Sequence, residues 1–229
     1  MKLQNGFFMT DSVNPVLPPE EWTLVYEKTT AGTDTLSVGW GRYKVEASAG
    51  GGGGATALAA IHPNSAGASG GCGAYGDGII EYSPSDTDTL TIVVGGAGNG
   101  ATKIEGTAAS TAGGNTTLSD TTHGTEFVLL RGGAAGYAHA TQNGDNAYVG
   151  SGGTFTTSLT DNNFHNGTQG KSASTSSDPK SATNTTNPSP YNTVGYGGGW
   201  AYNLLNNRSQ SASNGGVGFV RIYKSNLKP

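Results

Sequence analysis

Ala49-Gly50-Gly51-Gly52-Gly53-Gly54-Ala55 is an unbroken tract of the smallest residues, and it limits the kinds of fold that this chain can adopt. The chain has 39 glycines in 229 residues, or about 17%, against a usual share of roughly 7%. Ordering a residue costs about 1–2 kcal/mol, and glycine loses the most freedom. Glycine has no side chain to bury, so backbone hydrogen bonding and close backbone packing must offset this cost.

Further glycine tracts follow strongly apolar segments. Gly67 to Gly78, Gly95 to Gly100 and Gly132-Gly133 are the main ones, and apolar runs such as Leu90 to Val94 lie between them. This placement favours ordered tracts over the alternative of plain disorder. The glycines come as doublets and a quintet rather than at every third position, which excludes collagen and suits short polyproline-II-like runs lying side by side. Such runs have no internal hydrogen bonds, so their amides are available to neighbouring runs.

Alternating apolar residues predict short strands on both sides of the tracts. We expect three short strands in residues 22–47, with Gly32, Gly39 and Gly41 as turn residues between them. The other expected strands are Ile79 to Tyr82, Leu90 to Val94, Phe127 to Leu130 and Val217 to Tyr223. No ten-residue window has helical spacing. The predicted fold class is all-β: short antiparallel strands framing a packed bundle of polyglycine or polyproline-II-like helices, with long polar loops.

Composition divides the chain into an arm and one glycine-rich domain. Residues 1–21 contain Pro15, Pro18 and Pro19 and are predicted to form an extended attachment arm, which Phe7 and Phe8 dock onto a partner. Residues 22–229 are the predicted glycine-rich β domain, whose variable loops lie around 137–214, a region rich in Asn, Ser and Thr. Long loops in a compact domain are uncommon unless they are functional.

The charge balance argues against nucleic acid as a partner. Twelve Lys and Arg oppose sixteen Asp and Glu, for a net charge of −4 and no basic cluster, whereas affinity for nucleic acid depends on neutralising phosphates. Cys72 is the only cysteine, so no intrachain disulfide can form. We find no secretory signal and no apolar stretch long enough to span a membrane, so we expect the protein to be made in the cytoplasm and to stay there unless lysis or a dedicated secretion system releases it.

Two glycine-containing motifs are better explained by composition than by catalysis. Residues 67–71 match the G-x-S-x-G pattern of a nucleophile elbow, which needs a strand before the serine and a helix after it. Residues 96–101 resemble a dinucleotide-binding turn, but no helix follows to hold a phosphate. We therefore expect neither an enzyme nor a bound cofactor.

Metal binding is not expected either. His62, His123, His139 and His165 are far apart, with none at helical ligand spacing from another. Asp86 and Asp88 are interpreted as loop residues before a strand. The sequence thus predicts no metal site.

Scattered aromatic residues are the most suggestive feature of the polar region. Tyrosine and tryptophan supply large, stiff contact areas with a polar handle. Two interpretations are open: these residues bind a receptor, or they pack over the glycine layer. The candidate receptor-binding residues are Tyr137, Tyr148, Phe155, Phe164, Tyr191, Tyr196, Trp200 and Tyr202.

The order of these motifs resembles the glycine-rich domain of bacteriophage tail proteins. The resemblance rests on the strands of residues 22–48, the tract 49–54, and the segments 90–98, 113–118 and 215–223. It implies β-strands that frame a bundle of polyglycine helices. It also implies loops between the tracts that bind the host surface, as in the polyglycine-sandwich adhesins at long-tail-fibre tips. Residues 154–194 depart from the pattern, being longer and more polar than a tight adhesin loop.

The resemblance predicts a virion protein, located in the tail or at a fibre tip. Its expected partners are other virion proteins, reached through the N-terminal arm, and a bacterial surface glycan or outer-membrane protein. A homo-oligomer is a further option. A purely structural virion or filament subunit is the main alternative, and an ice-binding or matrix protein is a third.

Overall fold

The fold is all-β, as the sequence predicts. The computed structural model describes residues 18–58, 65–101, 104–105, 107–141, 144–173, 184–199 and 212–227. Within these ranges every regular element is a strand and none is a helix. The described part of the chain accordingly holds no helix long and apolar enough to cross a bilayer.

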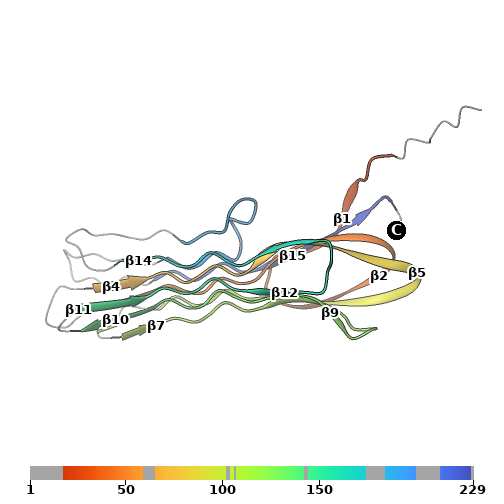
Figure 1. Cartoon of the computed structure of the whole chain (residues 1–229). Coiled ribbons are helices and arrows are strands. Elements are labelled where there is room, and N and C mark those ends of the chain that lie inside the picture. The colour runs from red at the N-terminus through yellow and green to blue at the C-terminus, as the bar shows by residue number, and fades with distance from the viewer. Residues whose placement is uncertain are drawn as a thin grey trace, which may run out of the picture.

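An eight-stranded antiparallel sheet forms one end of the elongated molecule (Figure 1). The strands follow the order β1-β15-β2-β5-β8-β9-β12, and β13 pairs with β5 beside this path. The strands are β1 (Trp22–Lys28), β2 (Gly32–Ser48), β5 (Tyr75–Val94), β8 (Thr116–Asp120), β9 (Thr125–Leu130), β12 (Phe155–Thr157), β13 (Asn162–His165) and β15 (Phe219–Ser225).

Two small sheets lie at the opposite end (Figure 1). One has the order β11-β10-β7 and the other β14-β4-β3-β6. Their strands are β3 (Ala55–Leu58), β4 (Ser65–Ala68), β6 (Ile104–Glu105), β7 (Thr107–Ala109), β10 (Tyr137–Thr141), β11 (Gly144–Tyr148) and β14 (Ser172–Ala173). Only the contact between β3 and β6 is parallel among the pairings of the described strands.

The prediction that all strands are short is wrong for the central pair. β2 has 17 residues and β5 has 20, and the two pair along their length. Gly39 and Gly41 are not turn residues, because they lie inside β2, where the register shifts as at a β-bulge. Asp88 is not a loop residue either, since it pairs with Val38 in the ladder and is buried. Extended pairing satisfies backbone groups that a turn at these positions would have left to solvent.

The large apolar side chains lie in the eight-stranded sheet. Val45, Leu90, Ile92, Leu130 and Ile222 are completely buried there. The pattern of β8 alternates between buried and half-buried positions, as expected for a strand with one face on the core. Side-chain burial therefore stabilises this end of the molecule.

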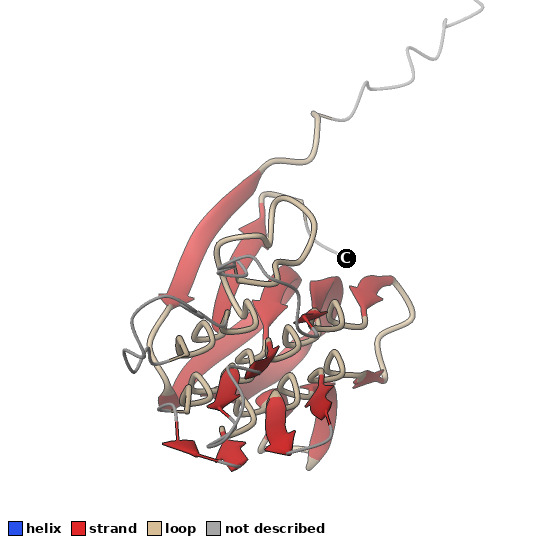
Figure 2. Cartoon of the chain, turned by 90° about the vertical axis from the view of Figure 1, so that its left-hand side faces the viewer, coloured by secondary structure: helices blue, strands red, loops and turns tan. Residues whose placement is uncertain are grey.

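Glycine runs connect the two ends, and Figure 2 shows them end-on as small coils lying side by side. The amides of residues 50–54 hydrogen-bond to other glycine runs, and amides three residues apart in the tract donate to the same neighbouring run. The amides of Gly50 and Gly53 donate to residues 114 and 111, at 3.0 Å each. The amides of Gly51 and Gly54 donate to residues 216 and 213, and that of Gly52 donates to Gly71.

The carbonyl oxygens of the same tract follow the same rule. Those of Gly50 and Gly53 accept from residues 133 and 136, and those of Gly51 and Gly54 accept from residues 98 and 101. The carbonyl oxygen of Gly52 accepts from Gly198 at 2.8 Å. The tract that the sequence singles out is therefore hydrogen-bonded on all sides, and its backbone groups find partners without any side chain.

Candidate functional site

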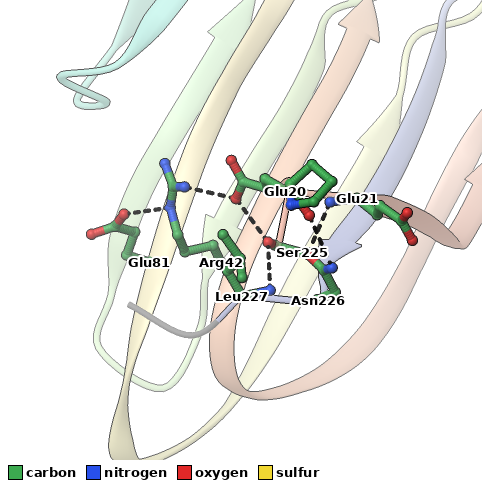
Figure 3. Close-up of polar contacts among 8 residues, drawn as sticks. Glu20, Glu21, Arg42, Glu81, Ser225, Asn226 and Leu227 are labelled. Atoms are coloured by element: carbon green, nitrogen blue, oxygen red, sulfur yellow. Dashed lines mark hydrogen bonds and ion pairs between the residues drawn. The ribbon is translucent and has the colours of Figure 1, made fainter. Parts of the chain in front are cut away.

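At the large-sheet end, the described part of the N-terminal arm is held on the sheet. Arg42 on β2 joins Glu20 of the arm to Glu81 of β5, with a nitrogen–oxygen distance of 2.7 Å in both ion pairs. The Ser225 hydroxyl also donates to Glu20, at 2.7 Å (Figure 3). These contacts fix the point at which the arm meets the body.

The two ends of the domain meet at the same place. The amide of Glu21 donates to the Asn226 side-chain oxygen at 2.9 Å, and the amide of Asn226 donates to the Glu21 carbonyl at 3.0 Å (Figure 3). Residues 19–21, which the sequence assigned to the arm, are thus hydrogen-bonded to the end of β15. Phe7 and Phe8, the predicted attachment residues, lie outside the described residues.

The opposite end carries hairpins. β3 and β4 pair out to Leu58 and Ser65, and β10 and β11 pair out to Thr141 and Gly144. Both hairpins start next to a glycine run, because Ala55 of β3 follows the central tract and Tyr137 of β10 follows Gly136. Both lie at the end of the molecule opposite the eight-stranded sheet (Figure 1), and we call this part of the molecule the hairpin end.

Tyr137 and Tyr148 form an exposed aromatic pair at the hairpin end. They are cross-strand partners on β10 and β11, with ring centroids 5.9 Å apart. Tyr137 is 39% exposed and Tyr148 is 59% exposed, whereas Ala138, the next residue after Tyr137 on β10, is fully buried. The alternation along β10 directs both rings to the outer face of the sheet. Of the described residues in the predicted aromatic set, these two offer the most contact area to a partner.

Four of the other predicted aromatics pack inside the protein. Phe155 and Phe164 contact each other at 6.1 Å beside the main core, and Phe164 is buried. Tyr191 is also buried, next to Tyr75. Tyr196 is half-buried and its ring lies against Gly216.

Among these four, Tyr196 fits the second interpretation, in which the aromatics pack over the glycine layer, whereas Phe155, Phe164 and Tyr191 pack in clusters of side chains. Phe155, Phe164 and Tyr191 lie with strands of the eight-stranded sheet and not at the hairpin end, so they are not part of the surface formed by Tyr137 and Tyr148. Trp200 and Tyr202 lie outside the described residues, as does His62.

The G-x-S-x-G match does not expose a nucleophile. Ser69 is fully buried, and its hydroxyl is 2.9 Å from that of Thr185. Cys72 is buried as well and donates to the Thr185 carbonyl at 3.1 Å. Burial raises the pKa of the Cys72 thiol and keeps it neutral.

Backbone amides of the dinucleotide-like turn, residues 96–101, are hydrogen-bonded to neighbouring segments of the protein. The amides of Gly98 and Ala101 donate to carbonyl oxygens of the central tract, and that of Gly100 donates to Asn214. These donors are therefore not free to hold a phosphate.

Asp88, Asp120 and His123 form a group that local sequence spacing did not reveal. Their potential ligand atoms lie within 4.8 Å of one another, which is close enough to hold a metal ion. His123 Nδ1 is 3.0 Å from Asp120 and 3.4 Å from Asp88. Burial alone would raise the pKa of Asp120, but hydrogen bonds from His123 and from the backbone amide of Thr122 lower it. The His123 imidazole thus already lies within ion-pair distance of both carboxylates, and we propose no metal function.

Compared with known proteins, the sequence matches no protein-family model and no curated protein.

Proposed function

We propose that the glycine runs are polyproline-II-like helices packed in a bundle. A helix with three residues per turn turns every third amide to the same side. The partner runs of Gly50 and Gly53, and of Gly51 and Gly54, recur at this interval. This periodicity supports the bundle that the sequence predicts between the two sets of strands.

We further propose that the chain is a non-enzymatic bacteriophage virion protein of the tail or a tail-fibre tip, which binds the bacterial host surface. The observation that carries this proposal is the placement of two different surfaces at opposite ends of a hydrogen-bonded scaffold. The arm enters beside Arg42 and Asn226 at one end, and the Tyr137–Tyr148 pair lies at the other. An adhesin needs this arrangement, because attachment and receptor binding must not compete for one surface.

In this proposal the arm attaches the chain to other virion proteins, and the hairpin end contacts a bacterial surface glycan or outer-membrane protein. An exposed tyrosine pair suits both ligands, since each ring combines apolar area with a hydroxyl group. The packed glycine runs hold the hairpin end rigidly, which reduces the entropy lost on binding.

An adsorption assay tests the proposal. Purified full-length chain should bind cells of a susceptible bacterial strain and should block their infection by the phage. A resistant strain that lacks the receptor is the matched control. If the chain binds both strains equally, or neither, the proposed function is wrong.

A structural virion or filament subunit is the second candidate, and one observation favours it. Leu24 and Val25 are 48% and 43% exposed on β1, the edge strand beside the arm. Exposed apolar residues on an edge strand are suited to pairing with a neighbouring subunit. Two results together would support this candidate instead. The parent chain would assemble but would not adsorb to host cells, and a Leu24→Ser, Val25→Ser double variant would no longer assemble.

A further inference from the structure

A recess of about 470 Å³ lies in the eight-stranded-sheet half of the molecule, away from the hairpin end. Strand β5 contributes Tyr75 and Asp77 to its wall, and β13 contributes Asn163 and His165. Strand β2 and the segment 188–191 complete it. Its volume falls within the range of about 300–1,000 Å³ that is usual for small-ligand sites.

Part of the wall is aromatic and rigidly held. The Tyr75 ring is 4.9 Å from that of Tyr191 and 5.4 Å from that of His165. Tyr191 in turn stacks on Phe219, with centroids 6.1 Å apart. Tyr75 and Tyr191 are only 8% and 9% exposed, so each offers a ligand a small, rigidly held part of its ring beside the exposed His165.

The other part of the wall consists of hydrogen-bonding groups in fixed positions. Glu46 pairs with Lys44 at 2.8 Å and accepts from the Tyr223 hydroxyl at 3.1 Å. Tyr191 donates to Asp77, and burial together with the carboxylates of Asp77 and Glu46 raises the pKa of Tyr191. The tyrosine thus stays neutral, and the carboxylates keep their orientation.

The charges in the recess select against anionic ligands. An anion would face the carboxylates of Glu46 and Asp77, and the one ammonium group among the described lining residues, that of Lys44, is already paired with Glu46. A neutral ligand with several hydroxyl donors and one apolar face satisfies both parts of the wall. A sugar ring has this chemistry, because its hydroxyls suit carboxylate acceptors and its C–H face suits aromatic rings.

We propose that this recess binds a neutral sugar residue of a glycan. Asp77 and Asn163 hydrogen-bond its hydroxyl groups, and Tyr75 and Tyr191 contact its apolar face. The proposal concerns a different surface from the hairpin end, so it holds or fails independently of the receptor-binding role proposed there.

Saturation-transfer NMR and calorimetry on the full chain test this proposal with three probes: D-glucose, N-acetyl-D-glucosamine and D-glucuronate. We expect saturable binding of at least one neutral sugar and about tenfold weaker binding of the anionic D-glucuronate. Asp77→Asn and Asn163→Ala should each weaken sugar binding by about tenfold, the usual effect of losing one hydrogen bond to a charged or well-placed group. Asn163 is exposed, so its substitution leaves the fold intact.

Two control variants locate the site. Asn192→Ala changes an exposed asparagine that does not line the recess, and Tyr148→Ala changes the hairpin end. Neither should alter sugar binding. The proposal is overturned if neither neutral sugar binds saturably, if D-glucuronate binds best, or if Asp77→Asn and Asn163→Ala both bind as the parent does. Loss of sugar binding in Tyr148→Ala overturns it too, whereas failed host adsorption with intact sugar binding counts only against the adhesin role.

Discussion

Gly133 lies so close to Gly71 that a Cβ atom at residue 133 would come within 3.0 Å of the carbonyl oxygen of residue 71. The contact is with backbone, which cannot rotate away as a side chain can. The amide of Gly133 also donates to the carbonyl oxygen of Gly50 at 2.9 Å. A methyl group at this position must therefore push two runs apart and strain a hydrogen bond between them.

The first prediction compares two glycines of the scaffold. Gly133→Ala should lower the free energy of unfolding by about 1–3 kcal/mol or more, the usual cost of overpacking a rigid interior. Gly96→Ala is the matched control, because a Cβ atom there would meet only the Ala31 side chain, at an ordinary 3.5 Å. Gly96→Ala should leave the free energy of unfolding unchanged or raise it slightly, because alanine reduces the conformational entropy of the unfolded chain. Denaturant unfolding of both variants measures the difference, and equal stability would show that close backbone contact does not hold the runs together.

Amide hydrogen exchange tests the same scaffold without a substitution. The amides of Gly51, Gly53 and Gly98 donate to neighbouring runs and should exchange slowly. If they open only with global unfolding, protection of about a thousandfold or more is expected for a domain of ordinary stability. Gly124, in an exposed turn, should exchange fast and serves as the internal reference. Fast exchange throughout the central tract would contradict the proposed bundle.

The ion pair between Arg42 and Glu20 predicts an effect on how often the arm detaches from the sheet, and little effect on the free energy of global unfolding. Arg42→Ala removes both ion pairs of Arg42, which are partly exposed and so contribute at most about 1 kcal/mol to folding. Residues 18–21 should then leave the sheet more often, and a glutamate-specific protease should cleave after Glu20 or Glu21 faster. Lys28→Ala, which breaks a separate ion pair with Asp34, should leave that rate unchanged. Equal cleavage rates in all three proteins would mean that Arg42 does not retain the arm.

The Asp120–His123 contact predicts a pH dependence of stability. The pKa of Asp120 is lower in the folded protein, so its ionised form stabilises the fold above the unfolded-state value of about 3.9. This contribution is lost as the pH falls through the lowered folded-state pKa. Asp120→Asn should therefore be less stable than the parent at pH 7, by about 1–2 kcal/mol. Urea unfolding across the acid range should show this gap closing at low pH, and a constant gap would contradict the assignment.

Local patterns predicted the most apolar strands and the glycine tracts, but not how far each strand extends. The prediction that residues around 137–214 are loops is wrong in part, because β10 to β14 lie within residues 137–173. The apolar run from Leu90 to Val94 was placed correctly in a strand. Gly39 and Gly41 were mistaken for turns because glycine marks both turns and bulges, and only the pairing partner β5 distinguishes them.

The sites depended on contacts between distant segments. Asp88 and His123 are brought together by the pairing of β5 with β8, and the recess combines residues from four segments. Nothing in the spacing of Tyr75, Asn163 and Tyr191 along the chain indicates that they share a wall. The Tyr137–Tyr148 pair was missed as well, because residues 137–214 were expected to form loops, whereas β10 and β11 pair there.

The last prediction concerns this tyrosine pair and the host. If the hairpin end contacts the receptor, Tyr148→Ser should weaken adsorption to susceptible cells by about thirtyfold, equivalent to about 2 kcal/mol for an aromatic residue central to an interface. The unfolding free energy should change little, because the ring is 59% exposed. Leu24→Ser removes a similarly exposed apolar side chain at the arm end and should adsorb as the parent does. A Tyr137→Ser, Tyr148→Ser double variant removes the exposed tyrosine pair from the described residues of the hairpin end. If this variant adsorbs to cells as well as the parent does, the receptor contact lies elsewhere.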